Sequence, residues 1–199
     1  MFKKIMLVAA SAAFAFSAVQ PAVAAGPTGL ARHFRTAPSV SYIVANKRTT
    51  APFAHVRFCM DNPSQCISGG AAMMDMDADR EDQLVRVNTG VNRSIKPVND
   101  SATTAAGDVW SLDVAEGDCE DFALTKREKL LAMGWSPRAL RIAMATTASG
   151  VGHAVLVVKT DKGDLVLDNR TSQIKNWRYT DLKIVKIQSG DNARQWYTL

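Results

Sequence analysis

The chain has 199 residues, of which 47% are hydrophobic and 22% are charged. These proportions are ordinary for a soluble globular protein, and they exclude the collagen-like, coiled-coil and wholly disordered classes. The formal charge of +5 is spread along the chain without a long basic run, so we expect no nucleic-acid partner.

The N-terminus has the layout of a secretory signal peptide. Two lysines precede an apolar stretch over Ile5–Val19, and an Ala-Val-Ala cleavage site stands at 22–24. An uncleaved membrane anchor is the alternative, but the apolar stretch is short for a membrane span. We therefore expect residues 1–24 to be removed on export to the periplasm, and residues 25–199 to form a single domain.

The expected elements of the first half are an extended segment followed by helices. They are an extended lead-in at 26–52 with weak strand character at Val40–Val44, a short helix or strand at Phe53–Met60, a helix at Ala71–Ile95, and a polar, turn-rich stretch at Lys96–Asp108. Acidic residues near the start of the long helix interact favourably with its dipole.

Cysteines become informative once export is expected, because an oxidising compartment favours pairing and an odd count leaves one thiol over. There are three, at positions 59, 66 and 119. Cys59 and Cys66 flank a Pro-Ser turn, so we expect a disulfide between them, worth roughly 2–3 kcal/mol in the chain-entropy model. Cys119 is then the free thiol, either buried and inert or retained for its reactivity.

The second half predicts one clear helix and then an antiparallel sheet. The helix is Cys119–Met133, with Asp118 as its cap and Gly134 at its end. Its charged residues Lys126, Glu128 and Lys129 are expected to be solvated. The β-like runs are Leu140–Thr146, His153–Lys159, Leu165–Asp168 and Lys183–Gln188, with a hairpin loop at Thr160–Gly163. This order of elements indicates an α+β fold.

Cys119 is expected where a helix begins, and backbone N–H groups and the helix dipole favour a thiolate there. A thiolate nucleophile also needs a base. Of the three histidines, His33 lies in the lead-in and His55 precedes the expected disulfide. His153 follows a glycine-containing bend and opens an apolar strand, so it is the best-placed base.

The hairpin register supplies a third group. A loop at Thr160–Gly163 pairs Lys159 with Asp164, and it puts Asp168 diagonally across from His153 on one sheet face, about 7–8 Å away. Each of these polar residues alone is more often structural than catalytic. Taken with the free thiol, they predict a nucleophile, a base and an orienting acid.

The run Gly117-Asp118-Cys119-Glu120-Asp121-Phe122-Ala123 resembles the signature of the bacterial transglutaminase-like cysteine proteinases, which are exported enzymes with a papain/transglutaminase-like core. Further matching motifs stand in the expected order: Val87-Asn88, Val91-Asn92, Asp108-x-Trp110, Gly152-His153-Ala154-Val155-Leu156, Leu167-Asp168-Asn169, Trp177 and Trp196. The resemblance implies a cysteine endopeptidase with Cys119, His153 and Asp168 as its triad. Transglutaminase-type acyl transfer and a non-catalytic binding module of the same fold remain as alternatives.

The resemblance also implies partners. The best-understood branch of the family cleaves large surface adhesins in the periplasm, requires calcium, and is sequestered by a membrane receptor that responds to cyclic di-GMP. This implies a protein substrate such as a surface adhesin and an inner-membrane regulatory receptor. No organic cofactor is expected.

Three carboxylates crowd around the thiol: Asp118, Glu120 and Asp121. Like charges disfavour a thiolate. These side chains either cap the helix and point to water, or they bind calcium, a hard cation that takes oxygen ligands. The pattern Asp75-x-Asp77-x-Asp79 lacks the glycine and the closing glutamate of an EF-hand loop, so we reject a calcium site there.

Trp110 precedes Cys119 by nine residues. It either belongs to the core, or walls the active-site cleft and helps to position the oxyanion. The backbone N–H of Cys119 is the better candidate for an oxyanion donor.

Overall fold

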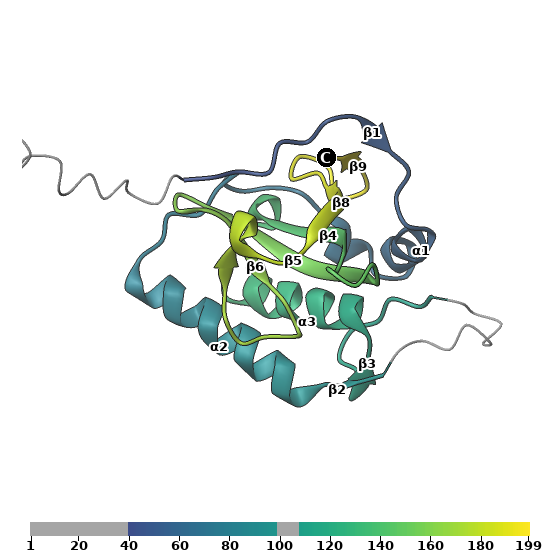
Figure 1. The fold of residues 1–199 in the computed structure, drawn as a ribbon, viewed down its shortest axis with the longest axis horizontal. Coiled ribbons are helices and arrows are strands. Elements are labelled where there is room, and N and C mark those ends of the chain that lie inside the picture. Colours follow the sequence, from purple (N-terminus) through teal and green to yellow (C-terminus); the bar gives the residue numbers. More distant parts are fainter. Residues whose placement is uncertain (1–39, 99–107) are drawn as a thin grey trace, which may run out of the picture. The chain divides into compact units, whose positions relative to one another are not determined.

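The computed structural model describes residues 40–98 and 108–199, and the expected signal peptide lies outside these residues. In this part of the chain, helices pack against an antiparallel sheet (Figure 1). This is the α+β architecture that the sequence predicts. No helix among the described residues is long and apolar enough to cross a membrane.

The described residues contain three α-helices, α1 (Phe53–Asp61), α2 (Ala78–Ser94) and α3 (Cys119–Ala132), and short 3-10 helices at Pro63–Cys66, Pro137–Ala139 and Trp177–Tyr179. Helix α2 begins later than the sequence suggests, because the side chain of Asp77 accepts a hydrogen bond from the Arg80 N–H at 2.8 Å and caps it there. The disulfide between Cys59 and Cys66, with a Cα–Cα distance of 5.5 Å, ties α1 to the turn that follows.

Helix α3 carries a capping box formed by Asp118 and Asp121. It packs against strand β5 (Gly152–Thr160) and helix α2, and nine of its fourteen residues are buried. The expectation that Lys126 is solvated is therefore wrong: its exposed fraction is 0%. Lys129 of the same helix is exposed, as expected.

The sheet has seven strands in the order β1-β9-β8-β4-β5-β6-β7, and all neighbours are antiparallel. Its other strands are β1 (Arg48–Thr49), β4 (Leu140–Thr146), β6 (Gly163–Leu167), β7 (Lys175–Asn176), β8 (Lys183–Gln188) and β9 (Trp196–Thr198). A separate parallel pair joins β2 (Lys96–Pro97) to β3 (Glu116–Gly117). The weak strand expected at Val40–Val44 does not form.

The hairpin between β5 and β6 has the register that the sequence predicts, with Lys159 opposite Asp164. Gly163 has a φ of +103°, and a Cβ there would lie 2.8 Å from the carbonyl oxygen of Ser41. Glycine is therefore required for this turn to pack beneath the N-terminal segment. Strand β6 ends at Leu167, so Asp168 begins the turn that leaves the sheet.

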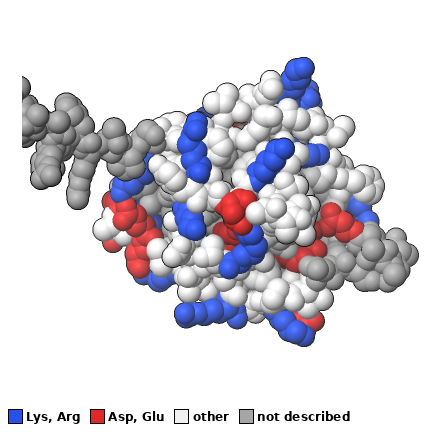
Figure 2. Space-filling view, viewed as in Figure 1, with Lys and Arg blue, Asp and Glu red and all other residues white. Residues whose placement is uncertain are grey.

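Hydrophobic side chains cover both faces of the sheet. One face packs with the helices through residues that include Leu140, Leu156 and Leu167. The other carries residues such as Val157 and Ile187 and is covered partly by Ile43 and Trp177. Basic and acidic side chains intermingle on the surface seen in Figure 2.

Candidate active site

The thiol of Cys119 lies where α3 meets the sheet. Its Sγ accepts a hydrogen bond from the backbone N–H of Ala154 at 3.2 Å. Ala154 directly follows His153 on β5, so this bond brings the start of the helix to the strand that carries the histidine. The thiol is half-buried and unpaired with any other cysteine.

His153 and Asp168 form a direct pair, with 2.9 Å between Nε2 and Oδ1. Both are buried, with exposed fractions of 6% and 4%. The two residues reach each other because the register places them on adjacent strands and the turn after β6 brings the carboxylate toward the ring. The structure thus brings together Cys119, His153 and Asp168, the three residues singled out from the sequence.

Arg170 is a site residue that the sequence reasoning missed. Its guanidinium donates to Asp168 Oδ2 from Nε at 3.0 Å and Nη2 at 2.8 Å, and its backbone N–H donates to Oδ1 at 2.9 Å. Burial opposes the ionisation of Asp168, but hydrogen bonds from His153 and Arg170 outweigh it and hold the pKa of this carboxyl below its ordinary value. Arg170 is held in turn by Asp181 at 2.7 Å.

Two asparagines of α2 fix the turn that carries Asp168. Asn92 Nδ2 donates to the carbonyl oxygens of Asp168 and Thr171, both at 3.0 Å. Asn88 Nδ2 donates to those of Thr171 and Ser172, both at 3.2 Å. These amides explain the two Val-Asn motifs: they dock the turn onto the helix.

The acidic residues beside the thiol form a cluster, but with a different membership from that expected. Asp108, Asp118 and Glu120 each offer an oxygen within 4.8 Å of the others. Asp121 belongs elsewhere: its Oδ1 accepts from the Ser111 N–H at 2.7 Å and its Oδ2 from the Asp118 N–H at 3.4 Å. The third carboxylate of the cluster is therefore Asp108, whose only signal in the sequence is its place in the Asp108-x-Trp110 motif.

The cluster also touches the nucleophile. The thiol of Cys119 donates to Glu120 Oε2 at 3.2 Å. Burial, followed by interactions with Asp108 and Asp118, raises the pKa of Glu120 to about 10. Burial and the neighbouring Glu120 likewise raise the pKa of Cys119 above its ordinary value. With its carboxylates uncompensated, this site therefore disfavours the thiolate.

The structure places Trp110 in the core. Its ring lies 5.3 Å from that of His55 and 6.4 Å from that of Trp196, and only 5% of the residue is exposed. Burial and the nearby Arg127 and Arg194 lower the pKa of His55 to about 4, so this histidine is a neutral core group at physiological pH.

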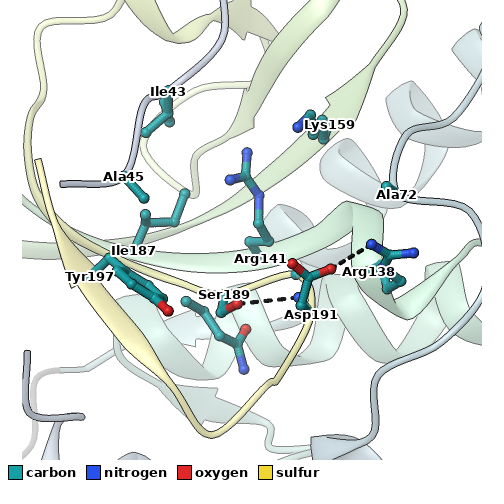
Figure 3. Close-up of a pocket in the computed structure, with 12 residues that line it drawn as sticks. Ile43, Ala45, Ala72, Arg138, Arg141, Lys159, Ile187, Ser189, Asp191 and Tyr197 are labelled. Carbon is teal, nitrogen blue, oxygen red and sulfur yellow. Dashed lines mark hydrogen bonds and ion pairs between the residues drawn. The ribbon is translucent and has the colours of Figure 1, made fainter. Parts of the chain in front are cut away.

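A cavity of about 340 Å³ lies elsewhere on the molecule (Figure 3). Its lining includes Arg138 and Arg141, but none of the residues discussed above as triad members or as the acidic cluster. Arg138 is paired with Asp191 at 2.5 Å and Arg141 with Asp164 at 2.6 Å. These carboxylates offset the two arginines, and we assign the cavity no part in the chemistry.

A half-buried thiol at a helix start, next to a strand histidine that is bonded to an aspartate, is the arrangement of papain/transglutaminase-like proteins. The chain belongs to the bacterial transglutaminase-like cysteine proteinase family, whose model matches residues 45–199. Among solved structures it is similar to calcium-bound LapG of Legionella pneumophila, with 31% identity, a TM-score of 0.51, and coverage of 59% of this chain and 68% of that one. EGTA-treated LapG matches with 32% identity, the same TM-score, and coverage of 60% and 67%. No curated protein matches the chain.

Proposed function

We propose that this chain is a periplasmic cysteine endopeptidase with Cys119, His153 and Asp168 as its catalytic triad. Membership of a cysteine proteinase family supports the reaction class. The observation that carries the assignment is the 2.9 Å contact between His153 and Asp168, one residue away from the backbone N–H that binds the thiol. A nucleophile, a base and an orienting acid are thus gathered in one place, as this chemistry requires.

The contacts allow each group a role. The Nε2–H of His153 donates to Asp168, which leaves Nδ1 to take the proton of the Cys119 thiol. The thiolate sulfur then attacks the peptide carbonyl carbon, and the imidazolium returns its proton to the departing amine. Water, deprotonated by His153, attacks the thioester, releases the acid and restores the thiol. Asp168 orients the ring and stabilises its charged form.

The backbone N–H of Cys119 is a candidate donor to the oxyanion that forms during the attack. It stands at the first turn of α3, where N–H groups have no partner within the helix. Such a donor stabilises the charge that develops on the carbonyl oxygen.

Calcium fits the acidic cluster by the chemistry of its donors. Asp108, Asp118 and Glu120 supply closely spaced carboxylate oxygens, the ligands that calcium prefers. A bound calcium ion would neutralise the negative charge next to the thiol. That LapG is described in a calcium-bound and an EGTA-treated form supports this proposal.

The location and the substrate class rest on the sequence. The signal-peptide layout supports export to the periplasm. The family resemblance supports a protein substrate such as a surface adhesin, and a regulatory receptor in the inner membrane. A binding module of the same fold would need no reactive thiol, so the reactivity of Cys119 separates that alternative from the proposed endopeptidase.

The test compares cells that produce the wild-type chain with cells that produce Cys119→Ala. We expect mass spectrometry of cell-surface proteins to show new peptide ends, made by hydrolysis, only with the wild type. New isopeptide links in place of new ends would favour acyl transfer. Identical surface proteins in the two strains, together with slow alkylation of Cys119 in the purified chain, would contradict the endopeptidase.

A further inference from the structure

Lys126 is the only fully buried lysine among the described residues. It lies on α3, seven residues after Cys119, and its Nζ has no hydrogen-bond partner in the described part of the chain. Burial lowers the pKa of Lys126 to about 7, although the charge of Asp168 opposes this effect. A buried ammonium without partners is costly, so its presence calls for a function.

Three buried amide oxygens likewise lack a hydrogen-bond partner among the described residues. The Oδ1 atoms of Asn88, Asn92 and Asn169 are buried and accept no hydrogen bond from the described residues. The orientation of the first two amides is settled, because their Nδ2 groups donate to carbonyl oxygens of the turn at 168–172. Flipping either amide would place oxygen against oxygen.

The unpartnered groups lie on two packed helices and on the turn that begins at Asp168. Asn88 and Asn92 of α2 donate to carbonyl oxygens of this turn, and Asn169 belongs to it. Lys126 lies on α3, which packs against α2. An ammonium has three N–H donors and can therefore serve more than one acceptor. Buried water commonly joins polar groups of this kind across a short gap.

We propose that Lys126 is a positioning residue of the active site: its ammonium donates through buried water to the amides that dock the Asp168 turn onto α2. The identification of the site as catalytic rests on the proposed function above. The helix that begins with the nucleophile thereby also fixes the acid of the triad. A shift of about 1 Å in such a group can lower a rate by about 10²-fold.

The test uses Lys126→Met, which keeps the length of the side chain but removes its donors and its charge. The matched control is Lys129→Met, at an exposed position of the same helix. The main readout is hydrogen exchange of the Arg170 backbone amide, which donates to Asp168 Oδ1. We expect exchange about tenfold faster in Lys126→Met, measured relative to the amides of β4, and no change in the control.

Turnover provides a second readout once the surface-protein comparison has supplied a substrate. We expect Lys126→Met to lower kcat by about 10- to 100-fold with KM unchanged. Lys126→Arg, which keeps the charge and the donors, should recover part of this loss. The exchange measurement does not need catalysis, so it tests the positioning role even if the chain cleaves nothing.

Two outcomes would overturn the proposal. Equal acceleration at Arg170 and throughout β4 would mean that Lys126 only fills the core, and unchanged exchange would mean that it does not hold the turn.

If Lys126→Met does not fold, NMR of the ¹⁵N-labelled wild-type chain at pH 6 tests the proposal instead. Slowly exchanging Nζ protons with cross-peaks to the Asn88 or Asn92 amide are expected, and rapidly exchanging protons would contradict the hydrogen bonds.

Discussion

Two buried carboxyl groups of the candidate active site, Asp168 and Glu120, differ in what surrounds them. Asp168 receives hydrogen bonds from His153 and Arg170, and its pKa is held below the ordinary value. Glu120 lies among other carboxylates, and its pKa is raised to about 10. The chain itself stabilises the ionised form of Asp168, whereas Glu120 needs a bound cation to be ionised together with its neighbouring carboxylates. This difference separates a group that orients the base from groups suited to hold an ion.

The largest expected effect comes from removing the thiol of Cys119. Cys119→Ala should abolish cleavage and leave the fold intact, because the change is small and the residue is only half-buried. Circular dichroism and a cleavage assay check this together. The matched control is the double variant Cys59→Ser and Cys66→Ser, which should lose stability but retain some activity, since that disulfide lies outside the site. Turnover by purified Cys119→Ala would refute the assignment of the nucleophile.

The acidic cluster is tested next. A calcium chelator should stop cleavage and added calcium should restore it, and Asp108→Asn should weaken calcium binding measured by calorimetry. Asp121→Asn is the matched control, because Asp121 binds backbone N–H groups and lies outside the cluster. It should lower the melting temperature more than the calcium affinity. Full activity in chelator, with no heat of calcium binding, would show that the carboxylates serve only the helix terminus.

Removing the charge of Asp168 should give a smaller but still large loss of turnover. Asp168→Asn keeps the size of the side chain and removes the charge that stabilises the imidazolium. We expect kcat to fall by about 10²-fold, less than the 10⁴-fold loss known for the equivalent change in a serine triad, because a thiolate–imidazolium pair can form before substrate binds. Asp164→Asn is the control: this carboxylate bonds Arg141 and the Ile43 N–H, so its loss should affect stability. The reverse pattern would make Asp164 the third member.

These comparisons show which properties of the molecule can be predicted from sequence patterns. The hairpin register was predictable because the side-chain period of a strand is two residues and the loop residues are distinctive. The burial of Lys126 was not predictable, because helical periodicity assumes one solvated face, whereas α3 packs against both β5 and α2. That Asp108 and not Asp121 belongs to the acidic cluster could not be predicted either, because Asp108 lies in a segment before β3 and only the fold brings it to the start of α3. Local patterns thus predicted the main helices, the central strands and the triad candidates. The short strands β1, β7 and β9 and the environment of each charge depend on the tertiary structure.

The smallest expected effect concerns Arg170, which stabilises the charge of Asp168. Because the pKa of Asp168 is depressed in the folded chain, its ionised form adds stability above the pKa of the unfolded chain. This stability is lost as the pH falls through the lower folded value. Arg170→Met should move the folded pKa back toward the ordinary value and so remove part of the contribution. The guanidinium is about one-third exposed, so we expect a loss of only about 1 kcal/mol at pH 7.

The pH dependence separates this electrostatic role from simple packing. Urea unfolding should show the largest difference between wild type and Arg170→Met at neutral pH, and a shrinking difference as the pH falls below about 4, where the carboxyl becomes protonated in the unfolded chain. In an Asp168→Asn background the same substitution should cost less at pH 7, because the carboxylate that Arg170 pairs with is absent. Asp181→Asn tests the other partner of Arg170 and should have the smaller effect, since Asp181 is largely exposed. A difference that stays constant from pH 7 to pH 3 would mean that Arg170 contributes through its packing alone.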